Sequence, residues 1–325
     1  ATAYLRLYLL SLISIVSYNM GSGILRALGN TKSPTLYQLA GGIANIIGNT
    51  LFICFLDWGV QGAALATACS QGLAAFLIIR HLCTIKTPYR LRLRQLQINA
   101  SICGQFLLVG IPAAIQSIVI TLSNLIVQAH INQLGIDSMA AFTAYFKVEN
   151  FIYLPIMAFG QACSTFTSQN IGANQVDRAK QGVKTSLFLG ITVTISASVL
   201  TLCFSDFAFG LFSKEPAVIA LGTKIAFVAY PFYFIYVFLE VYASAIRGAG
   251  KALPAMLIVV INMCVVRTCI LKVVLHFYPN ALGVAAIYPL TWACTGLCLF
   301  LYYKSGGWFS AQTDVARKRI SVGQR

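Results

Sequence analysis

Long apolar stretches separated by short polar turns dominate the hydropathy pattern of this chain. A helix needs about 20 apolar residues to cross a bilayer, and this pattern predicts nine such helices. The spans are expected at residues 4–25, 35–56, 60–82, 104–131, 139–167, 183–205, 217–246, 254–276 and 282–303. A longer polar segment, 83–103, separates the third predicted span from the fourth. The pattern therefore predicts an all-α polytopic membrane protein.

The composition agrees with a membrane protein. Hydrophobic residues make up 58% of the chain and charged residues only 10%, against about 25% charged residues in an average soluble domain. The ten cysteines lie mostly inside apolar runs and lack the paired spacing of a metal site. We interpret them as small buried hydrophobic side chains, and we expect no metal site.

Basic residues are concentrated in alternate connections between the predicted spans. The rich connections hold Arg26, Lys32, Arg80, Lys86, Arg90, Arg92, Arg94, Arg178, Lys180, Lys184, Arg247 and Lys251, and the end of the chain holds Lys304, Arg317, Lys318, Arg319 and Arg325. The other connections contain one basic residue, Lys214. The positive-inside rule makes the rich connections cytoplasmic, so the chain is expected to begin outside and to end in the cytoplasm. The net charge of +15 therefore reflects topology, and no nucleic-acid partner is expected.

A short pattern of residues occurs twice. In the first copy, Arg26 and Gly29 precede Pro34, and Gly62 lies near the start of the second span after Arg26. In the second copy, Arg247 and Gly250 precede Pro254, and Gly283 lies near the start of the second span after Arg247. In both copies 36 residues separate the Arg from the last Gly. Arg ends a helix at the interface, Gly permits the turn, and Pro begins the next helix. The matched spacing predicts a parallel internal repeat of two lobes.

The repeat predicts a domain division and a missing segment. The second copy has six spans and the first only three, so about 120 residues of the first lobe are expected before Ala1. We expect a partial N-lobe at 1–82, a basic cytoplasmic linker at 83–103, a C-lobe at 104–303 and a cytoplasmic tail at 304–325. The linker alternates apolar and basic residues at 89–98, which favours a segment on an anionic leaflet, although a bound partner is an alternative.

Four stretches resemble bacterial members of the multidrug and toxic compound extrusion (MATE) family. They are AAFTAYFKVENFIYLPIMAFGQACSTFTSQNIGA at 140–173, YPFYFIYVFLEVYASAIRGAGKALP at 230–254, GIPAAIQS at 110–117 and GVQGAALATACSQ at 59–71. They resemble the eighth helix with its following loop, the tenth helix with its exit, the start of the seventh helix and the sixth helix of that family. The similarity covers about residues 1–306.

The resemblance implies a two-lobed exporter of amphipathic, often cationic drugs in the bacterial cytoplasmic membrane. Such exporters work by alternating access and are driven by H⁺ or Na⁺, so we expect no cofactor beyond the coupling ion, and we expect a monomer in the lipid bilayer. The first-helix carboxylate of many family members falls in the segment absent here. The seventh-helix acid of some members has no match, because that predicted span, 104–131, contains no acid.

Two acids lie inside the predicted spans. Glu149 is placed about 15 Å from the outer end of its helix, and Glu240 about 10 Å from the cytoplasmic interface, at 1.5 Å per residue. Charged residues at membrane depth are costly and mostly functional. A carboxylate there can exchange protons or help to hold Na⁺, so we expect both residues to couple transport to an ion.

Polar and aromatic side chains accompany both acids. Tyr233 and Tyr236 share a helix face with Glu240, and Tyr145 and Tyr153 share one with Glu149. Aromatic rings beside a carboxylate suit organic cations, so the sequence favours a cavity, to which we also assign Gln116 and Asn124. Packing at a lobe seam is the alternative for the tyrosines, and hydrogen bonding between helices is the alternative for the amides. Pro231 is expected to kink its helix and to serve as a hinge.

Two bases at membrane depth need partners. Lys147 and Glu149 are two residues apart and point to nearly opposite sides of one helix, so Glu240 is the candidate partner of Lys147, and Glu149 that of Arg267. Either pair could be permanent and structural, or could open when the acid is protonated.

Other functions remain as alternatives. A flippase for lipid-linked precursors, from the same broader superfamily, should have a strongly basic cavity, whereas only Lys147 and Arg267 lie at membrane depth here. An enzyme would need a nucleophile, a base or a metal cluster, and the three histidines, His81, His130 and His276, are scattered. We therefore predict no catalytic residue. A seven-helix receptor would not explain the repeat.

Overall fold

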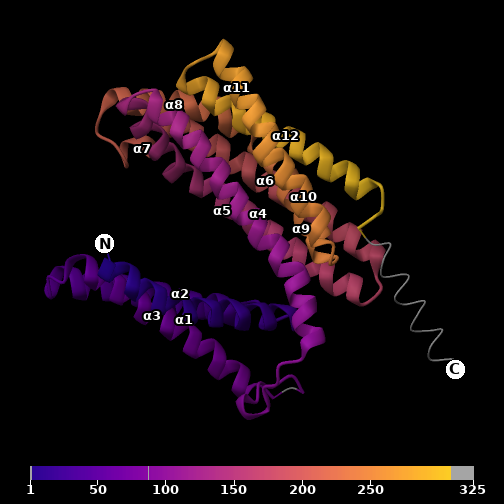
Figure 1. The fold of residues 1–325 in the computed structure, drawn as a ribbon. Coiled ribbons are helices and arrows are strands. Elements are labelled where there is room, and N and C mark those ends of the chain that lie inside the picture. The colour runs from indigo at the N-terminus through magenta and orange to yellow at the C-terminus, as the bar shows by residue number, and fades with distance from the viewer. Residues whose placement is uncertain (1, 87, 309–325) are drawn as a thin grey trace. The chain divides into compact units, whose positions relative to one another are not determined.

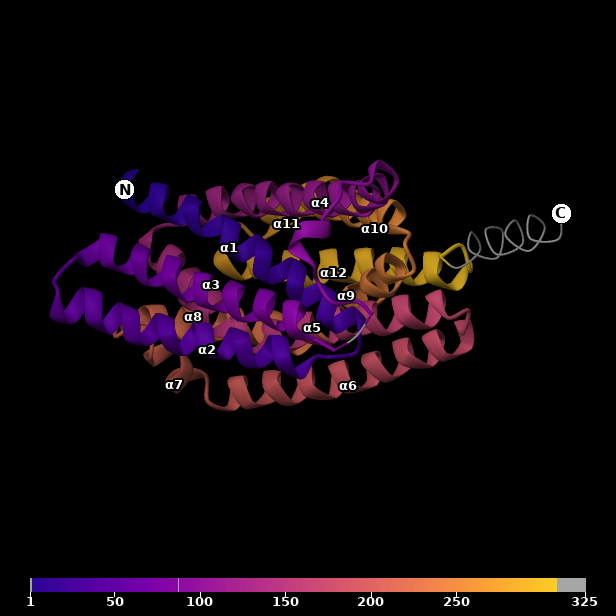
Figure 2. The same cartoon turned by 90° about the horizontal axis from the view of Figure 1, so that it is seen from below.

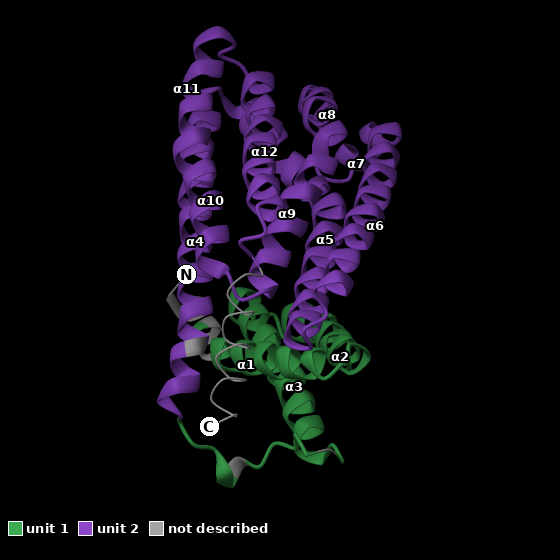
Figure 3. Ribbon diagram, turned by 90° about the vertical axis from the view of Figure 1, so that its right-hand side faces the viewer, with its two compact units in different colours: residues 1–98 green, residues 99–325 purple. Residues whose placement is uncertain are grey.

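The protein consists of two compact units. The computed structural model describes residues 2–86 and 88–308, and these residues form helices and contain no strand. Unit 1 covers residues 1–98 and unit 2 residues 99–325 (Figure 3). The boundary falls inside the segment 83–103, where the sequence predicts a linker. The predicted tail at 304–325 lies outside the described residues from position 309 onward.

Unit 1 contains three long helices that run side by side (Figure 1). They are α1 (Thr2–Ala27), α2 (Lys32–Asn49), which continues into the π-helical turn η1 (Thr50–Phe55), and α3 (Gly59–Thr84); the 3-10 turn η2 (Leu93–Gln95) follows. Small residues bring α2 close to α3: a Cβ added at Gly41 would lie 3.2 Å from the Ala74 Cβ, and one at Gly48 would lie 3.1 Å from the Ala66 Cβ. Close packing of small residues is typical of helix contacts in membranes.

Over its described residues, unit 2 contains six long helical rods, some of them broken by short irregular turns. Its elements are α4 (Ala100–Gln133), α5 (Ile136–Gly172), α6 (Val176–Cys203), α7 (Ser205–Gly210), α8 (Pro216–Ala229), η3 (Tyr230–Phe232), α9 (Tyr233–Gly248), α10 (Ala252–Val260), η4 (Ile261–Val266), α11 (Arg267–Phe277) and α12 (Ala281–Lys304). The rods follow one another in space in the order α6, α5, α9, α12, α10–α11 and α4 (Figures 1 and 2). Helices α5, α9 and α12 therefore form the interior of the unit.

The kink predicted at Pro231 is present. Helix α8 ends at Ala229, Pro231 lies in the 3-10 turn η3, and α9 begins at Tyr233. Proline removes a backbone donor and displaces the preceding turn, which explains why the helix is interrupted here. The break sets the direction of the first turn of α9, which carries Tyr233 and Tyr236.

The repeated turn has the same backbone structure in both copies. Gly29 and Gly250 adopt left-handed φ angles of 85° and 82°. The Asn30 N–H donates to the Leu25 carbonyl at 2.9 Å, and the Lys251 N–H donates to the Ile246 carbonyl at 3.1 Å. This six-to-one bond closed by a glycine is the Schellman helix end. The short pattern that occurs twice in the sequence thus forms the same turn at the ends of α1 and α9.

Most of the predicted spans satisfy a length and hydropathy test for crossing a membrane. Within the described residues, seven helical segments are long and apolar enough: 32–55, 59–84, 100–133, 176–203, 216–248, 252–277 and 281–304. The remaining two of the nine predicted spans correspond to the long helices α1 and α5, which are not among the seven. Helix α5 carries Lys147, Glu149 and Asn150 in its middle, so its apolar character is lower. Its placement between α6 and α9 makes it an interior helix.

Candidate binding cavity

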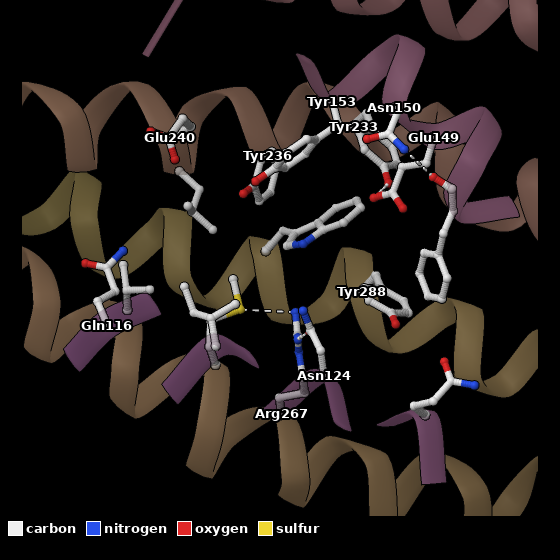
Figure 4. Close-up of a pocket in the computed structure, with 17 residues that line it drawn as sticks. Gln116, Asn124, Glu149, Asn150, Tyr153, Tyr233, Tyr236, Glu240, Arg267 and Tyr288 are labelled. Atoms are coloured by element: carbon white, nitrogen blue, oxygen red, sulfur yellow. Dashed lines mark hydrogen bonds between the residues drawn. The ribbon is translucent and has the colours of Figure 1, made fainter. Parts of the chain in front are cut away.

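A cavity of about 420 Å³ lies inside unit 2. It is lined by Gln116, Ile120, Asn124, Gln128, Phe146, Glu149, Asn150, Tyr153, Tyr233, Tyr236, Leu239, Glu240, Val259, Met263, Arg267, Tyr288 and Trp292 (Figure 4). The set contains both intramembrane acids, both predicted amides and three of the four predicted tyrosines. The sequence therefore located most of the polar side chains that it assigned to a cavity, although these residues come from helices far apart in the chain.

Aromatic rings form one wall of the cavity. Trp292 on α12 packs edge-on against Tyr233 and Tyr236 of α9, with ring centroids 4.6 and 5.3 Å apart. Tyr153 on α5 lies 5.7 Å from Tyr236, measured between centroids. Edge-to-face contacts at these separations stabilise aromatic clusters. The three central helices thus present a rigid aromatic surface to whatever occupies the cavity.

Glu149 is tied into this wall by a chain of hydroxyl groups. The Tyr233 hydroxyl donates a hydrogen bond to Glu149 Oε1. The Tyr145 hydroxyl lies 3.2 Å from the same Tyr233 hydroxyl. Because Tyr233 has one hydroxyl proton, which Glu149 accepts, Tyr145 donates to Tyr233. Glu149 therefore lines the cavity with its Oε1 anchored by Tyr233.

The prediction that Tyr145 lines the cavity is wrong. Its side chain is only 1% exposed, and its ring stacks on Tyr230 with centroids 5.1 Å apart. It shares a helix face with Glu149, as the spacing indicated. Its ring, however, fills the space behind Tyr233, so Tyr145 supports the wall from outside the cavity.

Glu240 has a different partner from the one predicted. Its Oε1 accepts a hydrogen bond from Arg247 Nη2 at 2.9 Å and another from Ser244 Oγ at 2.8 Å. Arg247 follows Glu240 by two helical turns on α9, so both lie on one face. The predicted Glu240–Lys147 pair is therefore wrong, because a basic residue on Glu240's own helix is closer.

Space for the Glu240 side chain is provided by a glycine on the neighbouring helix. A Cβ added at Gly160 of α5 would lie 2.7 Å from Glu240 Cγ and 2.8 Å from Glu240 Oε1. Any side chain there would displace the carboxylate. Glu240 is 7% exposed, and its charge-assisted bonds and tight surroundings hold it in one position.

The two membrane-depth bases also have partners other than the predicted ones. Lys147 is exposed, and its Nζ lies 5.5 Å from the centre of the Phe212 ring, in the turn after α7. Arg267 faces the cavity but makes no ion pair with Glu149 within the described residues, where the salt bridges join other residues. Instead its Nη1 donates to Asn124 Oδ1 at 2.9 Å.

Several cavity residues were not predicted. Tyr288 and Trp292 lie one turn apart on α12, and Met263 belongs to the π-helical turn η4. The aromatic pair at i, i+4 was visible in the sequence. What was not visible was that α12 would lie directly beside α9, since nothing in a hydropathy pattern orders helices in space.

Comparisons with known proteins agree with this architecture. Residues 112–271 match the family described as MatE. The chain is 28% identical to the probable multidrug resistance protein YpnP of Bacillus subtilis, over 95% of this chain and 68% of that protein. It is 25% identical to the probable multidrug resistance protein YoeA of the same organism, over 93% of this chain and 67% of that protein. The chain thus spans about two thirds of the length of these relatives.

A solved structure has the same fold. The crystal structure of MATE in the straight conformation matches 96% of this chain and 70% of its own, with a TM-score of 0.89 and 20% identity. The predicted all-α, polytopic architecture is confirmed by this match together with the helices and the matched family region. Residues 112–271 therefore belong to the multidrug and toxic compound extrusion (MATE) family of membrane efflux transporters, and the fold of the chain is the fold of that family.

Proposed function

We propose that the complete protein exports amphipathic organic cations across the bacterial cytoplasmic membrane in exchange for H⁺ or Na⁺. The observation that carries this proposal is the position of Glu149, whose carboxylate lines a cavity of about 420 Å³ beside Tyr233 and Tyr236. A negative charge next to ring faces attracts an organic cation. A volume of this order fits a drug-sized molecule.

The geometry separates the two acids into different roles. Glu240 is occupied by Arg247 and Ser244, so we assign it to holding α9 and not to ion exchange. Glu149 has one hydroxyl partner, Tyr233, and no basic partner within hydrogen-bond distance among the described residues. Glu149 is therefore our candidate for coupling, since protonation would change its net charge and its attraction for a cation.

Under this proposal two lobes expose the cavity alternately to the two sides of the membrane, and the basic connections lie on the cytoplasmic side. Under this proposal unit 2 is the C-lobe, unit 1 is part of the N-lobe, and the C-terminus is cytoplasmic. The break at Pro231 lies where the cavity wall of α9 begins. We propose it as the hinge that reorients Tyr233 between states.

The experiment is ethidium efflux from cells that express the complete reading frame under imposed H⁺ or Na⁺ gradients. Wild type should show efflux that depends on one of the gradients. Glu149→Gln should abolish that dependence at normal membrane abundance, while Lys147→Gln, a charge change on the exposed face of the same helix, should not. Absence of efflux of any organic cation under both gradients would contradict the proposal and would favour the flippase.

A further inference from the structure

A second cavity of unit 2 lies between α9 and α12, which run side by side (Figure 3). Its volume is about 330 Å³. Helix α9 contributes Ile235, Phe238 and Tyr242, and α12 contributes four residues within 293–300. These lining residues carry no charge, and one of them, Leu297, is 58% exposed. We call this feature the α9–α12 groove, an apolar depression that opens on the surface of the unit.

The groove and the cavity beside Glu149 lie on opposite sides of α9. The cavity residues Tyr233, Tyr236 and Glu240 each precede a groove residue by two positions. At 3.6 residues per turn, two positions correspond to about 200° around a helix. The groove is therefore a separate site from the cavity to which we assign export.

The internal repeat shows that the groove is particular to unit 2. The two copies of the repeated turn are 221 residues apart, and this offset places Ser17 and Gly21 of α1 at the positions of Phe238 and Tyr242. A Cβ added at Gly21 would lie 3.0 Å from Ile78 Cγ2 on α3. Small residues thus let α1 and α3 pack closely, whereas the corresponding positions of α9 carry the aromatic rings that wall the groove.

One end of the groove has the character of a membrane–water interface. The Tyr242 ring lies 5.7 Å from Phe300 and 5.0 Å from Tyr303, between centroids, and Trp308 stacks on Tyr303 at 4.9 Å. Tyrosine and tryptophan are enriched at such interfaces. Lys304 ends α12 there, is exposed, and has its Nζ 5.4 Å from the centre of the Phe300 ring. An amine therefore lies at the mouth of the apolar groove.

We propose that the α9–α12 groove binds an anionic phospholipid, with an acyl chain between the helices and the phosphate at Lys304. The lining suits an acyl chain, and a lysine binds phosphate as a point charge. The amine accompanies the groove, because the position of Lys304 is taken by Cys83 in the first copy of the repeat. Anionic lipids are concentrated in the cytoplasmic leaflet, where the proposed topology places Lys304. The inference goes beyond the proposed export and does not depend on the exported substrate.

Two photoreactive phospholipids test this site. A phosphatidylglycerol and a phosphatidylcholine with the same diazirine-labelled acyl chain are added in trace amount to the full-length protein in phosphatidylcholine nanodiscs. After illumination, peptide mass spectrometry measures the label on 235–242 and 293–300 relative to 188–200 of α6, a stretch with exposed apolar residues. Wild type should give a ratio about fivefold higher with phosphatidylglycerol, the effect of one basic residue near an anionic headgroup.

Two variants separate the headgroup from the acyl chain. Lys304→Gln should lower the phosphatidylglycerol ratio to the phosphatidylcholine value, whereas Lys32→Gln, at an exposed lysine of unit 1, should leave it unchanged. Gly296→Leu should lower the groove label from both probes, because a Cβ at Gly296 has only ordinary contacts, at 3.8 Å or more, and the longer side chain enters the groove. Gly110→Leu, at an open position of α4, should not.

The wild-type comparison alone can overturn the proposal, whether or not a variant folds. Equal ratios for the two probes would exclude a headgroup site. Label on α6 without label on either groove stretch would show that protein, such as a second copy of the chain, covers the groove. Equal losses in Lys304→Gln and Lys32→Gln would assign the preference to general surface charge, and an unchanged Gly296→Leu would place the acyl chain elsewhere. Ethidium efflux tests the proposed export separately from all of these outcomes.

Discussion

Glu240 and Arg247 form a hydrogen-bonded ion pair within a single helix, with 2.9 Å between Oε1 and Nη2. Their side chains are 9% and 23% exposed, so water screens the pair weakly. Removing one partner of a buried pair leaves an uncompensated charge and is strongly destabilising. We therefore propose that Glu240, which the sequence predicts as a coupling group together with Glu149, stabilises the fold instead.

We predict that Glu240→Ala lowers the free energy of unfolding by about 3–5 kcal/mol. The apparent Tm of the purified protein in detergent should fall accordingly. The double variant Glu240→Ala, Arg247→Ala should recover part of the loss, because no charge is left alone. A Tm that is unchanged while gradient-driven efflux disappears would contradict this and would return Glu240 to coupling.

Gly160 should be intolerant of a side chain. Gly160→Ala places a Cβ against the Glu240 side chain, and overpacking of this kind costs about 1–3 kcal/mol. Gly110→Ala is the matched control, because Gly110 lies in helix α4 of the same unit and a Cβ there meets nothing within 4 Å. Thermal unfolding should show a lower Tm for Gly160→Ala and an equal or higher one for the control. Equal effects would contradict the described packing.

The tyrosines should divide into supporting and contacting groups. Tyr145→Phe removes one buried hydroxyl contact and should cost about 1 kcal/mol of stability, with the Kd for ethidium changed less than about twofold. Tyr236→Ala removes a cavity ring and should raise that Kd about fivefold to thirtyfold, as loss of a cation–π contact does. Fluorescence titration of the purified protein measures both. A larger effect on Kd from Tyr145→Phe would place Tyr145 in the cavity after all.

The two repeated turns should respond alike to substitution. Gly29→Ala and Gly250→Ala each force a Cβ into a left-handed conformation at open positions, which costs about 1–2 kcal/mol. Gly104→Ala, at an open helical position, should cost nothing. If Tm falls for one repeated turn and not for the other, the two turns are not equivalent in the native protein.

Much of this architecture could be predicted because each membrane helix corresponds to one long, continuous apolar stretch of the sequence. The spans, the repeated Arg–Gly–Pro turns and the break at Pro231 depend on residues close together in sequence. The cavity was partly predictable as well, since buried charges in a membrane are rare. Glu149 was found in this way, Gln116 and Asn124 were found as polar side chains inside an apolar span, and all three line the cavity.

The pairing of charges could not be predicted in the same way. Glu240 was assigned to Lys147 because Arg247 was placed in a cytoplasmic turn, whereas α9 continues through Gly248 and keeps Arg247 on the Glu240 face. Arg267 was expected to pair with an acid, but the π-helical turn before it delivers the guanidinium to Asn124. The partner of a buried charged side chain depends on how the helices pack against one another, and the local sequence pattern carries no information about that packing.

We propose that the cavity beside Glu149 binds organic cations. The most direct test is the Kd of ethidium for the purified full-length protein, comparing wild type with Glu149→Gln and with Lys147→Gln. We predict that Glu149→Gln weakens binding about tenfold or more, the loss of a charge partner in a water-poor site, and that Lys147→Gln leaves it unchanged. Equal affinity of wild type and Glu149→Gln would show that this carboxylate does not attract the cation and would contradict the account.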